Sequence, residues 1–106
     1  MADALINTLH GTDGSVLVEV RGEIDLLCAE RLERIFVETA TRRRPARIVV
    51  DLLHVTFIDS TGIGALVAGR NAAHALGIGF TVRQPDGFVA GQLRQTGLYE
   101  VLTSER

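Results

Sequence analysis

The chain of 106 residues has no tryptophan, only two prolines and a single cysteine, Cys28. One cysteine cannot form an internal disulfide, which excludes a disulfide-stapled scaffold and fits a reducing compartment. No stretch approaches the run of about 18 apolar residues that a membrane-spanning helix needs, and the N-terminus lacks the pattern of a secretory signal. These absences predict a cytoplasmic protein with no membrane insertion.

An excess of charge is absent as well. Eleven basic and thirteen acidic side chains give a formal net charge of −2, which provides no general attraction to nucleic acid or acidic membranes. The basic cluster at residues 42–44 is short and precedes Pro45, so a solvated loop is favoured over a nucleic-acid patch. The three histidines show no ligand-like spacing with one another or with Cys28. We therefore expect no direct nucleic-acid partner, no metal and no other cofactor.

The apolar residues, in contrast, follow strand and helix patterns along the whole chain. The length suits one domain, residues 1–106. In chain order, the patterns predict strands at 4–9 and 15–21, a helix at about 27–40, a strand at 47–53, a helix at 62–76, a strand at 80–83, a helix from 85 to about 96 and a short strand at 99–102. An α/β fold follows, with helices packed on a mixed β-sheet of about five strands. The strand at 47–53 is nearly continuous in apolar character, which is typical of a strand covered on both faces.

The most informative stretch is VTFIDSTGIGAL, residues 55–66. It joins the carboxyl end of a buried strand to a helix that begins near Ser60, where α/β folds present functional residues. Ser60 or Thr61 is well placed to cap this helix. Gly62 and Gly64 lack side chains, so another backbone or a protein surface can approach closely. A phosphate on a hydroxyl here would lie in the positive field of the helix start.

Three enzyme motifs fail a check against this stretch. A dinucleotide fingerprint needs a third glycine, where Val67 stands, and a P-loop needs a lysine followed by Ser or Thr, a pair that is absent after these glycines. A nucleophile elbow needs a glycine where Ile58 stands. We expect no enzymatic activity, although a small enzyme with Ser60 as nucleophile remains as an outside alternative.

Three segments carry a family resemblance: GEID at 22–25, FIDSTGIG at 57–64 and TGL at 96–98. With these segments the sequence resembles a stand-alone STAS domain of the anti-sigma factor antagonist family. The resemblance implies that Ser60 is phosphorylated by a partner that is both anti-sigma factor and serine kinase. The unmodified antagonist would bind this partner and free a sigma factor. Phosphorylation would break the complex, and a serine phosphatase would restore it.

The same resemblance, together with the helix positions, predicts a partner-binding surface. Its members are Asp25, Asp59, Ser60, Thr61, Gly62, Ile63 and Arg70. Simpler roles stand beside several of these: Asp25 as a helix cap, Asp59 as a turn residue and Ile63 as part of the core. The loop of Asp25 should lie near Ser60, because both precede helices at one edge of the sheet.

The main alternative to the switch is a STAS domain that serves as an unphosphorylated scaffold subunit in a stress-signalling or transporter assembly. The Asp59–Ser60 pair favours the switch, since scaffolding needs no hydroxyl there. The chain stops at Arg106, where many relatives continue into a further helix. Surface left uncovered by that helix leaves room for a weak homodimer.

Overall fold

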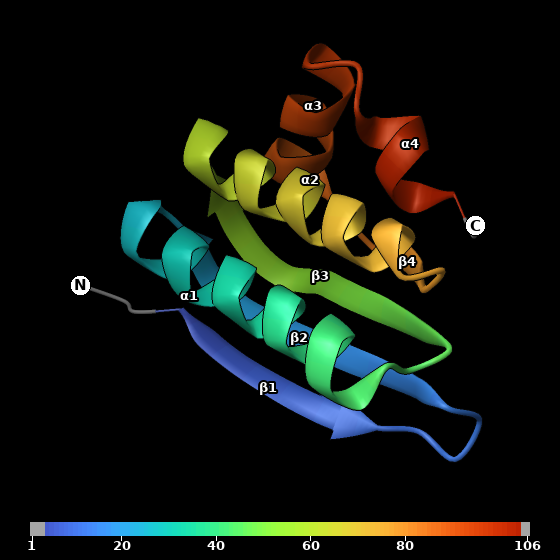
Figure 1. Ribbon diagram of the computed structural model, residues 1–106. Helices are drawn as coiled ribbons and strands as arrows, with labels where there is room; N and C mark the ends of the chain where they lie inside the picture. Colours follow the sequence, from blue (N-terminus) through green and yellow to red (C-terminus); the bar gives the residue numbers. More distant parts are fainter. Residues whose placement is uncertain (1–3, 105–106) are drawn as a thin grey trace.

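A computed structural model describes residues 4–104 as a four-stranded sheet with helices (Figure 1). The elements in chain order are β1 (Leu5–His10), β2 (Ser15–Ile24), α1 (Leu26–Glu38), the π-helical segment η1 (Thr39–Arg43), β3 (Arg47–Ile58), α2 (Ser60–Ala75), β4 (Gly79–Arg83), α3 (Gly87–Gln95) and α4 (Tyr99–Thr103). The predicted α/β class and the packing of helices on a mixed sheet are confirmed. No helix within residues 4–104 has the length and apolar character needed to cross a membrane.

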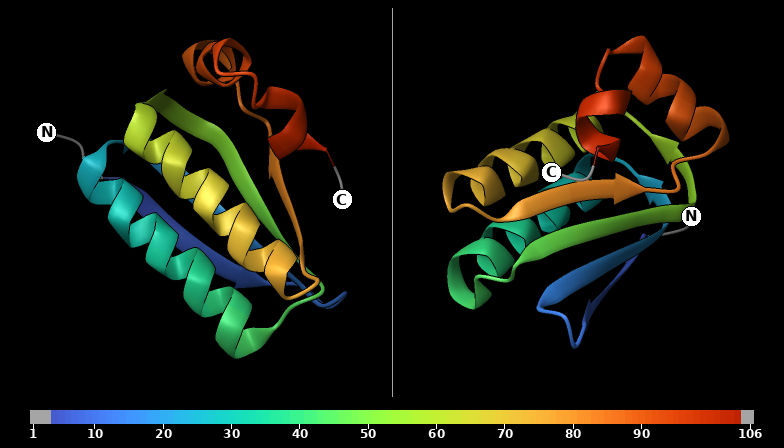
Figure 2. Two further views of the ribbon diagram at one scale, coloured as in Figure 1. Left: turned by 45° about the horizontal axis from the view of Figure 1, so that its top comes forward. Right: turned by 90° about the vertical axis from the view of Figure 1, so that its right-hand side faces the viewer.

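The strands lie in the order β1-β2-β3-β4. The hairpin pair β1 and β2 is antiparallel, whereas β2 with β3 and β3 with β4 are parallel. Both long helices, α1 and α2, run across one face of the sheet (Figure 2). Consequently β2 and β3 end at the same edge where α1 and α2 begin, and this edge carries the residues singled out above.

The opposite face of the sheet is open. Alternate residues of β2, β3 and β4, among them Val18, Val50 and Val82, are buried beneath the helices. Their neighbours on the other face are only half-buried, and Leu53 is 47% exposed. The prediction that residues 47–53 are covered on both faces is therefore wrong. Both crossover helices lie on the same side, so the apolar residues on the other side of β3 have no cover from α1 or α2.

The segment predicted as a fifth strand, residues 99–102, is the helix α4 instead. Gly97 adopts a left-handed conformation, with φ of 77°, and ends α3 with a sharp turn. After this turn Leu102 is fully buried, and its N–H donates to the carbonyl of Leu98 at 3.0 Å. The pair Leu98 and Leu102 has helical spacing, and burying it outweighs the strand preference of Tyr99 and Val101.

The two long helices pack closely because one residue has no side chain. A Cβ added at Gly69 of α2 would lie 2.8 Å from Cγ of Phe36 on α1. Phe36 is fully buried and packs edge to face against Phe80 of β4, with ring centroids 5.2 Å apart. This arrangement joins α1, α2 and the sheet in one core.

Candidate functional site

An aspartate caps the start of each of the three helices that follow strands. The carboxylates accept hydrogen bonds from first-turn backbone N–H groups: Asp25 from Cys28 (3.2 Å), Asp59 from Gly62 (3.0 Å) and Asp86 from Gly87 (2.8 Å). The role of Asp25 as a helix cap is thereby confirmed. The three caps follow β2, β3 and β4, so the helix starts gather at the carboxyl edge of the sheet.

At α2 the cap differs from the prediction. Asp59 has extended backbone and is the N-cap, while Ser60 is already the first helical residue. The prediction that Ser60 or Thr61 caps the helix is therefore wrong. The hydroxyl of Thr61 donates to the Asp59 carboxylate, which also accepts the Gly62 N–H. The Thr61 hydrogen bond is the main reason that the pKa of Asp59 lies below its ordinary value.

Ser60 stands between these bonded neighbours with its own hydroxyl uncommitted. The side chain is exposed, and within residues 4–104 its hydroxyl makes no hydrogen bond. Because Ser60 begins α2, a group attached to its oxygen would lie beside unpaired backbone N–H groups and the positive end of the helix dipole. The site can therefore accept an anionic modification without losing its cap.

The start of α1 lies beside this site, as predicted. Ile24 is paired with Ile58 at the end of the β2–β3 ladder, and the N–H of Asp59 donates to the carbonyl of Ile24 at 3.3 Å. Asp25, the next residue, is exposed. Asp25 and Asp59 thus follow paired residues on adjacent strands, and both present carboxylates close to Ser60.

The two glycines after Thr61 have different roles. A Cβ at Gly62 would meet Ile24 Cγ2 and Ile58 Cγ1 at 2.7 Å, so the close approach at this position is internal packing. A Cβ at Gly64 would meet nothing within 4 Å. Of the two, only Gly64 offers a bare surface to another molecule.

Two further residues of the predicted partner surface lie away from the exposed loop. Ile63 is buried, with 8% of its surface exposed, and belongs to the core. Arg70 is half-buried on α2, about 15 Å from Ser60 along the helix axis at the usual rise per residue. The structure brings Asp25, Asp59, Ser60 and Thr61 together, and Arg70 stands apart from them.

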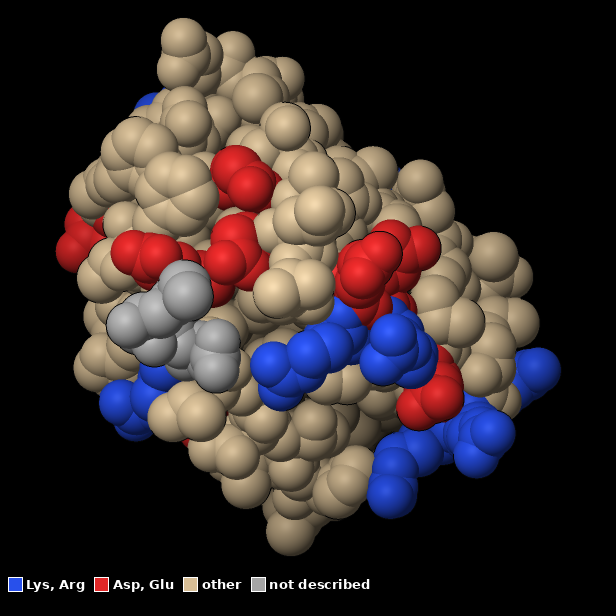
Figure 3. Space-filling view, turned by 90° about the vertical axis from the view of Figure 1, so that its left-hand side faces the viewer, with Lys and Arg blue, Asp and Glu red and all other residues tan. Residues whose placement is uncertain are grey.

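Exposed apolar side chains flank the site on two sides; we call them the apolar collar, and the sequence patterns did not predict it. Four large hydrophobic side chains, each within two residues of a capping aspartate, are exposed: Leu26 (57%), Leu27 (72%), Phe57 (37%) and Phe88 (51%). The rings of Phe57 and Phe88 stack, with centroids 5.4 Å apart and planes 12° from parallel. Viewed from this end, the upper part of the face is largely uncharged, with acidic side chains across the middle and basic ones mostly below (Figure 3).

One part of the collar could have been found from the sequence. Cys28, Leu32 and Phe36 follow helical spacing in the sequence and are buried on α1, and Leu27 lies outside that spacing. Phe57 and Phe88 stack although they are far apart in the chain, and no local pattern signals such a pair.

Comparisons with known proteins agree with this architecture. Residues 8–105 match the family model of the STAS domain. The phosphorylated form of the Bacillus cell fate determinant SpoIIAA is similar over 96% of this chain and 91% of that chain, with a TM-score of 0.76 and 16% identity. An anti-sigma factor antagonist from Mycobacterium paratuberculosis is similar over 94% and 83%, with a TM-score of 0.73 and 27% identity. A sulfate transporter family protein from Wolinella succinogenes is similar over 89% and 75%, with a TM-score of 0.74 and 21% identity.

Proposed function

We propose that this chain, which belongs to the STAS domain family, is an anti-sigma factor antagonist whose binding is switched off by phosphorylation of Ser60. The observation that carries the proposal is the free Ser60 hydroxyl at the start of α2, between Asp59 and Thr61, which bond to each other. The similarity to SpoIIAA and to the mycobacterial antagonist supports the choice of partner class.

The physical basis of the switch is the charge of the product. A phosphoserine carries about −1.5 to −2 charges at neutral pH. On Ser60 this charge stands next to the carboxylate of Asp59 and close to that of Asp25. A partner that covers the site must then desolvate three anionic groups together, which costs binding free energy. The fold tolerates the group because the helix start offers backbone N–H donors and a favourable dipole.

The apolar collar supports a protein as the docking partner. Exposed apolar surface around a site is typical of protein interfaces, where aromatic side chains contribute disproportionately to binding. Leu26 and Leu27 lie on the α1 side of Ser60, while Phe57 and Phe88 lie on the α3 side. A partner seated on both sides would place Ser60 near the centre of the contact, where an added charge weakens binding most.

In the proposed cycle the domain performs no catalysis. The anti-sigma partner, acting as a serine kinase, supplies ATP and metal, and this chain supplies the acceptor hydroxyl. The unphosphorylated form holds the partner, so the sigma factor is released in the cytoplasm. A serine phosphatase returns the phosphorylated form to the binding state.

The second candidate is a scaffold subunit that is never phosphorylated. The uncovered sheet face and the similarity to a sulfate transporter family protein favour it. A permanent subunit could use the open face for packing and leave Ser60 unmodified.

One experiment separates the two candidates. Tagged chain is used to recover partners from native lysate with ATP and Mg²⁺, and the recovered chain is mapped for phosphopeptides, with a Ser60→Ala bait as the matched control. The switch predicts that a kinase-like partner is recovered and that Ser60 of the unsubstituted bait carries phosphate. The Ser60→Ala bait should retain this partner for longer. Stable partners recovered equally by both baits, with Ser60 unmodified throughout, would favour the scaffold.

A further inference from the structure

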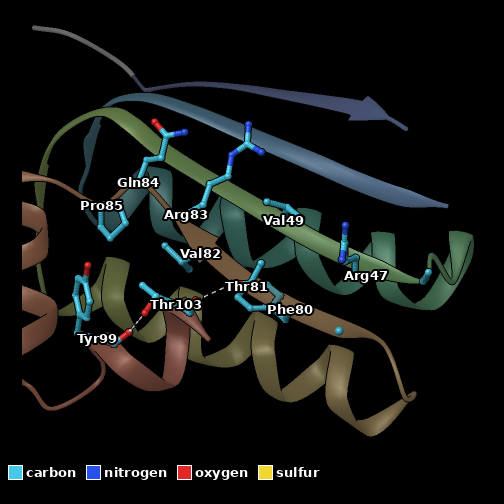
Figure 4. A pocket seen from close by; sticks show the side chains of 12 residues that line it. Arg47, Val49, Phe80, Thr81, Val82, Arg83, Gln84, Pro85, Tyr99 and Thr103 are labelled. Atoms are coloured by element: carbon cyan, nitrogen blue, oxygen red, sulfur yellow. Dashed lines mark hydrogen bonds between the residues drawn. The ribbon is translucent and has the colours of Figure 1, made fainter. Parts of the chain in front are cut away.

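A cavity of about 540 Å³ lies on the open face of the sheet beside β4, away from the Ser60 site (Figure 4). Small-molecule sites in proteins typically have volumes of about 300–1,000 Å³. The cavity is bounded by β4, the first residues of β3, which pair with β4, and α4. The helix α4, which stands where a fifth strand was predicted in the sequence, packs against β4 and forms one wall of this cavity.

The lining combines an apolar centre with basic ends. Val49 and Thr81 are neighbours in the β3–β4 register and form the floor, while Tyr99 and Pro85 stand on the α4 side. Along the strands, the remaining side chains include Arg47 toward one end and Arg83 toward the other. No aspartate or glutamate is among the residues that line the cavity.

Both arginines retain capacity for a ligand. Arg47 contacts Asp13 at 3.6 Å and Arg83 contacts Asp51 at 3.4 Å, and their side chains are 52% and 49% exposed. A guanidinium has five N–H donors, and a single contact at such a distance leaves most of them free. The cavity is therefore a place where an anionic group gains charge-assisted hydrogen bonds.

The wall opposite the sheet is held in place before any ligand arrives. The Thr81 hydroxyl donates to the carbonyl of Thr103 at 3.2 Å, and the Thr103 hydroxyl donates to the carbonyl of Tyr99 at 2.7 Å. The guanidinium of Arg94 stacks 4.2 Å from the centre of the Tyr99 ring. A preformed wall lowers the ordering cost of binding.

The backbone at the mouth of the cavity is unusual. Gln84, which lines it directly after β4, has φ of 57°, a left-handed conformation that a side chain other than glycine rarely adopts. Such conformations concentrate at binding and catalytic sites, where the surroundings hold them. Here the conformation presents the Gln84 amide on the same side as the Arg83 guanidinium.

We propose that this cavity binds a small amphipathic organic anion with a planar apolar body. The body would lie over Val49 and against Tyr99, and its carboxylate, sulfonate or phosphate would bind Arg83 or Arg47. A simple inorganic anion would leave the apolar floor unused, and a neutral hydrocarbon would leave the guanidinium groups unused. The proposal does not depend on the role of Ser60.

The test uses 2-naphthalenesulfonate as the probe and 2-naphthalenemethanol as its uncharged counterpart. Binding is measured by calorimetry, and the site is mapped by ¹H–¹⁵N chemical shift changes in the whole chain. We expect saturable binding of the sulfonate with shifts confined to β4, the facing part of β3 and α4, and at least about tenfold weaker binding of the alcohol.

Two substitutions and a control make the test specific. Arg83→Gln should weaken sulfonate binding about tenfold by removing a charge-assisted contact, and Val49→Phe should abolish it by filling the floor. Both positions lie on the open face, and urea unfolding of each variant checks that the fold is retained. Arg34→Gln, on exposed α1 surface, is the matched control and should bind like the unchanged chain. Chemical shift changes centred on the collar, or equal affinity of all variants for the sulfonate, would overturn the proposal.

Discussion

The hydroxyl of Thr61 donates a hydrogen bond to Oδ1 of Asp59, the oxygen that also caps α2. Because of this bond, the three adjacent polar residues 59–61 have different roles. Asp59 and Thr61 hold the helix start together, and the Ser60 hydroxyl between them makes no hydrogen bond within residues 4–104. The proposed phosphorylation site and the helix cap thus share one turn of the chain.

Removing the charge of Asp59 should reduce the loss of folding stability that accompanies a fall in pH. The lowered pKa of Asp59 means that its carboxylate contributes stability that is fully present above about pH 4 and is lost as the pH falls through the lowered pKa. Urea unfolding of Asp59→Asn across this range should show a smaller loss than the unchanged chain. Asp59→Ala, which removes the cap as well, should cost about 1 kcal/mol at neutral pH. An identical acid dependence in Asp59→Asn and the unchanged chain would contradict this assignment.

The bond from Thr61 can be tested separately. Thr61→Val keeps the shape of the side chain but removes the donor that contributes most to the lowered pKa of Asp59. We therefore expect the pKa of Asp59 to rise toward its ordinary value, as measured by carboxyl ¹³C shifts during an acid titration. Ser60→Ala is the control, since the Ser60 hydroxyl does not contact that carboxylate.

Ser60 substitutions should change partner binding more than stability. Ser60→Ala should bind the anti-sigma partner and resist phosphorylation, while Ser60→Asp should bind about a hundredfold more weakly, which corresponds to a loss of about 2–3 kcal/mol. Calorimetry with purified partner measures the affinity, and urea unfolding checks the fold. Equal affinity of Ser60→Asp and the unchanged chain would mean that charge at this position does not exclude the partner.

Gly62 and Gly64, the two glycines in the first part of α2, should respond in opposite directions to alanine. Gly62→Ala forces a Cβ against Ile24 and Ile58 and should destabilise the fold by about 1–3 kcal/mol. Gly64→Ala meets open space and should stabilise the helix by about 0.5–1 kcal/mol. Urea unfolding of both variants provides the comparison. If Gly64→Ala also weakens partner binding despite its greater stability, the bare surface at Gly64 is part of the contact.

The collar predicts which apolar side chains matter for the partner. Phe57→Ala and Phe88→Ala should each weaken partner binding by about tenfold or more, because aromatic rings that a partner covers are frequent hot spots. Leu9→Ala is the matched control: Leu9 is 50% exposed but lies on β1, and its loss should leave affinity unchanged. If Ser60 is fully phosphorylated but neither phenylalanine substitution changes partner affinity, the switch would stand and the role of the collar in binding would be refuted.

Much of the fold was predictable because the spacing of apolar residues and the positions of turn and capping residues agree along most of the chain. The family assignment made from the segments at 22–25, 57–64 and 96–98 is confirmed by the match over residues 8–105. The cap at Asp25 was predictable because one polar residue stands alone before its helix. At α2 three good capping residues stand in a row, and only the extended backbone of Asp59 decides among them.

Other features depend on contacts between distant residues. The segment 99–102 contains good strand formers, and its helical state follows from the burial of Leu102 after the turn at Gly97. The exposure of Leu26 and Phe57 becomes visible only once the buried face of each element is known. The cavity beside β4 is lined by residues from β3, β4 and α4, which are far apart in the chain, so no local sequence pattern predicts it.

The missing side chain at Gly69 sets the lateral spacing of α1 and α2 near the middle of α2, with Phe36 fitted against the bare backbone. The spacing of the two helix starts at the Ser60 edge therefore depends in part on a residue inside the core. In the proposed complex, a partner that contacts Leu27 and Ser60 together would depend on this spacing. A bulkier residue at position 69 would push α1 and α2 apart and shift their starts, so the proposed recognition at the surface would respond to a substitution at a buried position.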